Sequence, residues 1–301
     1  MTLLLLATGD TMAQRKSSMA TGRELLAMAG TPPQRVVVED VLAEPSWDMS
    51  VSTQLALARR VRKALAEDEF AGVVVTHGVD TLEETAFLTD LMAGPARGGI
   101  VFTGAFHPLS VPEPDGPDNL VASLAAAADP ALRGAGAVVC VRNELHAARR
   151  VRYAHGFSSA PHPMLGRVAG GAVHLTSTPP PRPPEVGGEP ETDVAVLRTY
   201  PDMPSSLLTT VTDLGAQGVV LEGTGAGNVP VELFGTIMEL SQMDIPVVVA
   251  SRAYTVDIGM AKRMGALGAG GLSAQQARMA LMVALSKGGG VAAALRYFGA
   301  L

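Results

Sequence analysis

Short runs of apolar residues alternate along the chain with longer stretches in which apolar residues recur at helical spacing. The runs are nearly free of polar side chains, as expected for β-strands that are covered on both faces. In the first part of the chain the predicted strands are residues 3–7, 36–38, 72–76, 100–103 and 137–141. The helical patterns between them are residues 51–65, 83–91 and 119–128. This alternation predicts an α/β fold with a mainly parallel sheet flanked by helices.

A proline-rich segment interrupts the alternation. Residues 179–193 begin with a Pro-Pro-Pro-Arg-Pro-Pro run and continue through two glycines into acidic residues, which neither a helix nor a central strand tolerates. We interpret this segment as a linker between a larger N-terminal domain, residues 1–178, and a smaller C-terminal α/β domain, residues 194–301. In the smaller domain we expect strands at 194–198, 218–222 and 246–250, and a long helix at 274–285.

Composition and charge narrow the function classes. Hydrophobic residues make up 47% of the 301 residues and charged residues 17%, which excludes general disorder. The net charge of −6 argues against a nucleic-acid binder, which needs a basic face. No apolar run approaches the roughly 18 residues of a membrane span, and the run at 3–7 lacks the features of a signal peptide. We therefore expect a soluble, cytoplasmic protein with no membrane partner.

Metal and cofactor signals are weak. The single cysteine, Cys140, lies in an apolar run, where a buried thiol is expected, and it excludes internal disulfides and cysteine-based zinc sites. The glycine-rich segment at 223–228 lacks the spacing of a dinucleotide fingerprint. Four histidines show no metal-ligand spacing with carboxylates and are expected on the surface or in loops: His146, His155, His162 and His174. The sequence thus predicts no metal and no organic cofactor.

Two loops that follow predicted strands share hydroxyls, glycine and a carboxylate. Thr8-Gly-Asp-Thr11 follows the first strand, and the segment from Thr76 to Thr85 follows the third. Ligands bind outside the carboxyl ends of parallel strands, and two such loops on neighbouring strands would form a pocket suited to acyl transfer through a threonine. The alternative interpretation is ordinary helix capping, with Asp80 or Thr81 as the N-cap.

These two segments resemble the signature segments of the bacterial-type L-asparaginase (asparaginase/glutaminase) family. The second, Thr-His-Gly-Val-Asp-Thr-Leu-Glu-Glu-Thr at 76–85, is very specific. Further similarity to the family runs the length of the chain, at residues 46–49, 104–108, 115–120, 143–153, 163–166, 223–230, 250–252 and 272–278.

The resemblance implies roles for several residues. Thr11 matches the threonine that attacks the side-chain amide carbon while ammonia leaves. Asp80 matches the aspartate that holds the substrate's α-amino group, and Ser46 matches the serine of the substrate-clamp loop. Asn228 matches a residue that reaches into the neighbouring subunit's site. The resemblance therefore implies a homodimer or homotetramer with active sites at the subunit interface, acting on a small molecule.

The chain also departs from the family pattern. Val79 stands at the position where the family has a catalytic threonine, and Tyr153 falls near the position where it has a catalytic lysine. Further departures are Trp47 for glutamine, Asp10 for glycine, His107 for arginine, and Met19 near the place of a loop tyrosine. Valine has no hydroxyl and tyrosine no cationic charge, so ordinary hydrolysis should be impaired unless other groups replace them. The candidate replacements are Asp10, Ser17 or Ser18, His77, Arg150 and Arg152.

His77 is expected to titrate near neutrality, although a structural role is the safer interpretation. The indole of Trp47 suits a substrate that is bulkier or less polar than free asparagine.

Three hypotheses follow from these residues. The first is an asparaginase-family amidohydrolase acting through Thr11, with an altered substrate and weak activity on free L-asparagine. The second is an enzyme of another class, such as a cyclase, lyase or isomerase of specialised metabolism, that uses Asp10, Asp80 or His77 as acid or base. The third is a catalytically inactive amino-acid-binding homologue.

Overall fold

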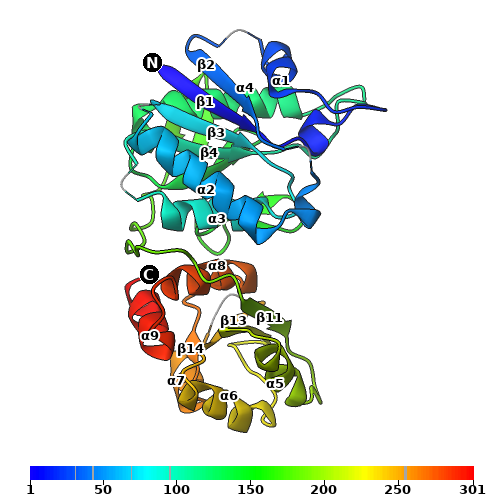
Figure 1. Ribbon diagram of the computed structural model, residues 1–301. Coiled ribbons are helices and arrows are strands. Elements are labelled where there is room, and N and C mark those ends of the chain that lie inside the picture. Colours follow the sequence, from blue (N-terminus) through cyan, green and yellow to red (C-terminus); the bar gives the residue numbers. More distant parts are fainter. Residues whose placement is uncertain (31, 43, 69, 95, 254–255) are drawn as a thin grey trace. The chain divides into compact units, whose positions relative to one another are not determined.

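The computed structural model describes residues 1–301 except 31, 43, 69, 95 and 254–255. The chain divides into two units, Met1–Arg182 and Pro183–Leu301 (Figure 1). Each contains a sheet flanked by helices, which confirms the predicted fold class. The predicted domain limits and the linker at 179–193 stay a prediction.

The sheet of the first unit has eight strands among the described residues, in the order β10-β9-β6-β5-β4-β3-β1-β2. Neighbours from β2 to β5 are parallel, and β6, β9 and β10 extend the sheet by antiparallel pairing. The parallel strands are β1 (Thr2–Ala7), β2 (Arg35–Asp40), β3 (Gly72–Thr76), β4 (Gly99–Thr103) and β5 (Ala137–Val141). The antiparallel ones are β6 (Glu144–Ala147), β9 (Gly166–Ala169) and β10 (Ala172–Leu175).

Helices cover both faces of this sheet. The helices α1 (Gly22–Met28) and α4 (Gly116–Ala128) lie on one face, and α2 (Val51–Ala66) and α3 (Leu82–Met92) lie on the other (Figure 1). The four consecutive leucines of β1 are fully buried because alternate side chains point to opposite faces and both are covered. The edge strand β2 departs from the expectation, since its three valines are only half-buried.

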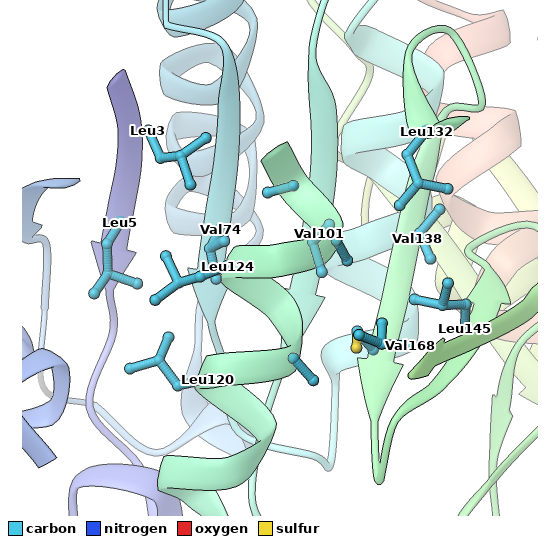
Figure 2. Close-up of a cluster of buried hydrophobic side chains, with 14 of the residues drawn as sticks. Leu3, Leu5, Val74, Val101, Leu120, Leu124, Leu132, Val138, Leu145 and Val168 are labelled. Carbon is cyan, nitrogen blue, oxygen red and sulfur yellow. The ribbon is translucent and has the colours of Figure 1, made fainter. Parts of the chain in front are cut away.

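One core cluster lies between α4 and the sheet. Leu3 and Leu5 of β1 pack there with Val74 of β3, and Leu120 and Leu124 of α4 reach down onto them (Figure 2). Farther along the sheet the same cluster includes the buried thiol of Cys140, as expected.

Shortening a side chain of this cluster should cost stability. We expect Leu5→Ala to lower the free energy of unfolding by about 3 kcal/mol, since Leu5 is fully buried and a cavity would remain. Urea unfolding followed by circular dichroism measures the change. The control is Val121→Ala, whose parent side chain is 47% exposed and whose loss should cost about 0.5 kcal/mol or less. Equal shifts in the two variants would contradict this assignment of the core.

The smaller elements of the first unit connect these strands. The 3₁₀ turns are η1 (Thr11–Ala13), η2 (Ser46–Asp48) and η3 (Pro130–Leu132), and a short hairpin is formed by β7 (Arg152–Tyr153) and β8 (Phe157–Ser158). The hairpin between β5 and β6 turns on two residues with positive φ, Arg142 and Asn143, as two-residue hairpin turns require.

The second unit has a parallel sheet in the order β11-β12-β13-β14. Its strands are β11 (Val194–Arg198), β12 (Gly218–Gly223), β13 (Val247–Ser251) and β14 (Leu267–Gly268). Its helices are α5 (Ser206–Asp213), α6 (Leu233–Gln242), α7 (Ile258–Arg263), α8 (Ala274–Ala284) and α9 (Gly290–Ala300). Leucine and isoleucine of α5 and α6 pack on the valines of β12 and β13. Among the described residues, no helix is long and apolar enough to span a bilayer.

Candidate active site

The loops after β1 and β3 are joined directly at the ends of their strands. The Thr8 hydroxyl donates to the Thr76 carbonyl oxygen at 2.7 Å, and the Thr8 N–H donates to Thr76 Oγ1 at 3.3 Å. Both residues are fully buried, and β1 and β3 are parallel neighbours. The two hydroxyl-bearing segments therefore converge at one edge of the sheet, as the sequence predicts.

Asp10 connects the first loop to the turn η2. Its Oδ1 accepts hydrogen bonds from the Thr11 N–H at 2.6 Å and from the Thr11 hydroxyl at 3.0 Å. Its Oδ2 accepts from the Ser46 N–H at 2.6 Å. The residue is only 7% exposed and has a φ of 62°, which glycine adopts readily and other residues rarely do. The carboxylate is thus held in one position beside the Thr11 hydroxyl.

Gly78 brings the loop after β3 against the Asp10 carboxylate. A Cβ at Gly78 would lie 1.9 Å from Asp10 Oδ2 and 2.2 Å from Ser46 Oγ, so no side chain fits there unless both residues move. Ser46 Oγ is buried and has no hydrogen-bond partner among the described residues. Three loops, after β1, after β3 and at η2, therefore meet around Asp10.

Thr81 does not cap α3 with its side chain. It stands at the N-cap position, yet its hydroxyl donates to the Ser46 carbonyl oxygen at 2.8 Å. The predicted N-cap position of Thr81 is therefore confirmed, but its hydroxyl makes no capping hydrogen bond and instead joins the loop after β3 to η2. Asp80, the residue before it, is exposed.

His77 and Val79 flank Gly78 and are both buried. His77 Nδ1 lies 2.8 Å from the Gly78 carbonyl oxygen, and Nε2 has no hydrogen-bond partner in the described part of the chain. Burial lowers the pKa of His77 below the ordinary imidazole value, so the imidazole is neutral at pH 7 and titrates at a lower pH than expected. Val79 packs against Gly104 of the loop after β4.

The remaining predicted site residues are less enclosed. Trp47 is 71% exposed and Tyr153 36% exposed, so the indole does not fill the space beside Thr11. Met19 pairs with Gln14 in an exposed turn. Asn228 is an exposed residue of the second unit, in the turn that pairs Thr224 with Asn228. The convergence of Asp80, Tyr153 and Asn228 with Thr11 stays a prediction.

Sequence reasoning missed an aromatic cluster around Tyr153. Its ring stacks on Phe106 at a centroid distance of 6.1 Å and lies 5.3 Å from the ring of Phe157. The Arg142 guanidinium lies 4.6 Å above the Phe106 ring, within the range of a cation–π interaction. Tyr153 and Phe157 share the β7–β8 hairpin, but Phe106 lies more than 40 residues earlier in the chain, and no local pattern marks their contact.

Glu83, in the first turn of α3, lies beside this cluster. Its Oε2 accepts a hydrogen bond from the Tyr153 N–H at 2.5 Å. Burial raises the pKa of Glu83 to about 7, while the Tyr153 N–H and the charge of Arg152 lower it and the charge of Glu84 raises it further. The carboxyl group is therefore partly protonated at neutral pH.

This raised pKa predicts a pH-dependent stability. The folded state holds the Glu83 proton more tightly than the unfolded state, whose pKa is near 4.5, so the stabilisation is complete at low pH and is lost as the pH rises to about 7. We expect Glu83→Gln, which removes the titration, to gain stability relative to the parent between pH 5 and pH 8. The gain should be on the order of 3 kcal/mol, measured by urea unfolding across this range. The exposed Glu113→Gln is the control, and parallel curves for parent and Glu83→Gln would contradict the assignment.

The expectation that His146 is a surface or loop residue is wrong. His146 lies in β6 and is 3% exposed, with Nδ1 2.8 Å from the Ser159 hydroxyl and Nε2 3.6 Å from Glu144. Strand β6 is too short to be recognised by periodicity, which explains the error. No cluster of three or more potential metal ligands occurs among the described residues.

Comparisons with known proteins find similarity to asparaginases in both units of the chain. The N-terminal asparaginase family model matches residues 2–181, and the glutaminase/asparaginase C-terminal domain model matches residues 193–298. A probable L-asparaginase of Deinococcus radiodurans is 33% identical over 95% of this chain and 93% of its own. An L-asparaginase of Bacillus licheniformis is 28% identical over 83% and 81%. The crystal structure of a probable cytoplasmic L-asparaginase from Campylobacter jejuni superposes with a TM-score of 0.87 at 26% identity, covering 100% of this chain and 99% of that one.

Proposed function

The chain belongs to the asparaginase family, and on this premise we propose that it hydrolyses a side-chain amide or a related acyl group through Thr11. The observation that carries the proposal is the hydrogen bond from the half-exposed Thr11 hydroxyl to the Asp10 carboxylate. A hydroxyl nucleophile needs a base within hydrogen-bond reach, and this pair supplies that arrangement at the carboxyl end of β1.

The proposed reaction has two halves. Thr11 Oγ1 attacks the amide carbon, ammonia or an amine leaves, and an ester between the acyl group and Thr11 remains. Water then cleaves this ester and restores the threonine. Ser46, whose buried hydroxyl lacks a partner among the described residues, and Asp80, which is exposed, are proposed to hold the carboxylate and amino ends of the substrate.

The substrate is proposed to differ from free L-asparagine. Val79 offers no hydroxyl for an oxyanion or a proton, and Tyr153 contributes an aromatic ring in place of a cation. Together with the exposed indole of Trp47, the ring of Tyr153 favours a bulkier or less polar acyl group. Activity on free L-asparagine is therefore expected to be weak.

We also propose a cytoplasmic homodimer or homotetramer. The similar Campylobacter protein is a probable cytoplasmic L-asparaginase, which supports the proposed compartment. By the family resemblance, exposed Asn228 of one subunit would complete the site of another. The mass of the protein in solution, measured by light scattering, tests the assembly.

Two other functions stay open, each favoured by an observation. The carboxylates of Asp10 and Asp80 would serve acid–base chemistry in a cyclase, lyase or isomerase. The absence of a hydroxyl at Val79 and of an ammonium at Tyr153 favours an inactive amino-acid-binding protein.

A screen for ammonia release tests the proposal. Amides, lactams and peptidyl-asparagine compounds are the substrates to compare with free L-asparagine, and the calorimetry of amino-acid binding runs beside it. Ammonia from a bulkier amide at a higher kcat/KM than from L-asparagine supports the proposal. Amino-acid binding without turnover of any amide would instead indicate the inactive homologue.

A further inference from the structure

We propose that Asp10 is a catalytic residue, the general base that takes the proton from the Thr11 hydroxyl. This inference rests on the proposed function and deepens it, because it assigns the base that the reaction needs. The contact is direct: Thr11 Oγ1 donates to Asp10 Oδ1 at 3.0 Å. That distance lies within the range over which a side chain abstracts a proton.

The carboxylate is oriented before any substrate arrives. The Thr11 N–H fixes Oδ1 at 2.6 Å and the Ser46 N–H fixes Oδ2 at 2.6 Å, so both oxygens are held by backbone donors. Gly78 closes the other side, where an added Cβ would overlap Asp10 Oδ2. Asp10 is 7% exposed whereas Thr11 is half-exposed, so a substrate can reach the hydroxyl while the base stays shielded.

The backbone at this position also points to a function. Asp10 has φ 62° and ψ −161°, a region that is almost exclusively populated by glycine. An aspartate held in this region is under backbone strain. The hydrogen bonds that hold this conformation are the same ones that place Oδ1 on the Thr11 hydroxyl. Strain of this kind clusters at functional sites, where the surrounding structure enforces it.

The groups packed against Asp10 are backbone donors, a hydroxyl, a glycine and a neutral imidazole. Of the elements packed against it, η1 offers the Thr11 hydroxyl and N–H, η2 offers the Ser46 N–H, and the β3 loop offers Gly78 and the buried His77. Among the described residues, His77 is a titratable neighbour that interacts electrostatically with Asp10, and its burial keeps the imidazole neutral at pH 7.

The proton then follows a balanced path. Asp10 Oδ1 accepts the hydroxyl proton as Thr11 Oγ1 bonds to the acyl carbon. Asp10 returns this proton to the leaving nitrogen as the C–N bond breaks. In the second half, water adds to the ester and gives a proton to Asp10, which passes it to Thr11 Oγ1 as the ester bond breaks.

Variants of Asp10 test this assignment with p-nitrophenyl acetate as the acyl donor. The readouts are the burst of p-nitrophenolate and the intact mass of acetylated protein. Asp10→Asn keeps the shape and should slow the acetylation of Thr11 by about 10²–10⁴-fold with little change in KM. Asp10→Gly suits the backbone conformation and leaves space for a small carboxylate. We expect 0.1–1 M formate to restore its burst at least tenfold while leaving Asp10→Asn unchanged.

A matched control separates chemistry from folding. Asp244 also has φ 62°, and its Oδ1 accepts a backbone N–H, that of Val291, at 2.9 Å in the second unit. Asp244→Asn should acetylate at the parent rate. A parent that acetylates while Asp10→Asn keeps its rate, or an Asp10→Gly defect that formate does not repair, overturns the inference alone. A parent that forms no acetyl-Thr11 and releases ammonia from no amide overturns the proposed function together with the inference.

Discussion

Thr11→Ala should lower the turnover of the best amide substrate about 10³-fold or more, with little effect on substrate binding. The hydroxyl that forms the covalent ester is lost, and removing a nucleophile disables a catalytic unit whose members act together. The loop itself should persist, because the backbone N–H of residue 11 still donates to Asp10, and Asp10 still accepts from Ser46. The measurements are steady-state ammonia release and mass spectrometry of a trapped acyl-enzyme.

A threonine outside the site serves as the matched control. Thr209→Ala removes an exposed hydroxyl on α5 that donates to a carbonyl oxygen of its own helix, and it should keep the parent turnover. Turnover that survives Thr11→Ala, with no acyl-enzyme found in the parent, would indicate the acid–base enzyme of another class.

The second large effect is a gain of function. We expect Val79→Thr combined with Tyr153→Lys to raise the hydrolysis of free L-asparagine about 10²-fold or more. Threonine matches the shape of valine and restores a hydroxyl, and a donor to an oxyanion is worth about 3–4 kcal/mol. The lysine would bring an ammonium toward Glu83, which accepts the N–H of residue 153 and would ionise more readily beside it.

Both single variants should be measured with the double variant, since neighbouring groups of one site do not act additively. Loss of the Tyr153 ring also removes the stacking on Phe106, so circular dichroism must show that the variant remains folded. A folded double variant that hydrolyses L-asparagine no faster than the parent would contradict the assignment of Val79 and Tyr153 to the positions of the family's catalytic threonine and lysine.

The parallel part of the sheet could be predicted because its strands are short, apolar and separated by helices. The predicted runs at 72–76 and 137–141 coincide with β3 and β5, and the leucine run falls within β1. The antiparallel extension was missed because β6, β9 and β10 have four residues each, too few for a period to emerge. Their turns did carry a signal, since Gly170 and Gly171 both have positive φ.

The candidate site could be predicted only as far as its loops follow strands. Hydroxyl-bearing residues in both loops identified the segments around Thr11 and Thr76 as candidate site segments. The parallel pairing of β1 and β3 then places these two segments side by side. The contact between Asp10 and the Thr11 hydroxyl depends on side-chain geometry that spacing does not encode. The raised pKa of Glu83 arises from its burial, and the hydrogen bond that partly offsets this effect comes from Tyr153, a residue 70 positions away along the chain.

The close approach of Gly78 to Asp10 and Ser46 makes these three positions mutually dependent. Because the space that a methyl group at residue 78 would need is already filled by oxygens from two other loops, the tolerance of each position to substitution is set by the other two. A laboratory evolution library that randomises one loop at a time should therefore yield mainly inactive clones, whereas covarying residues 10, 46 and 78 would open new specificities.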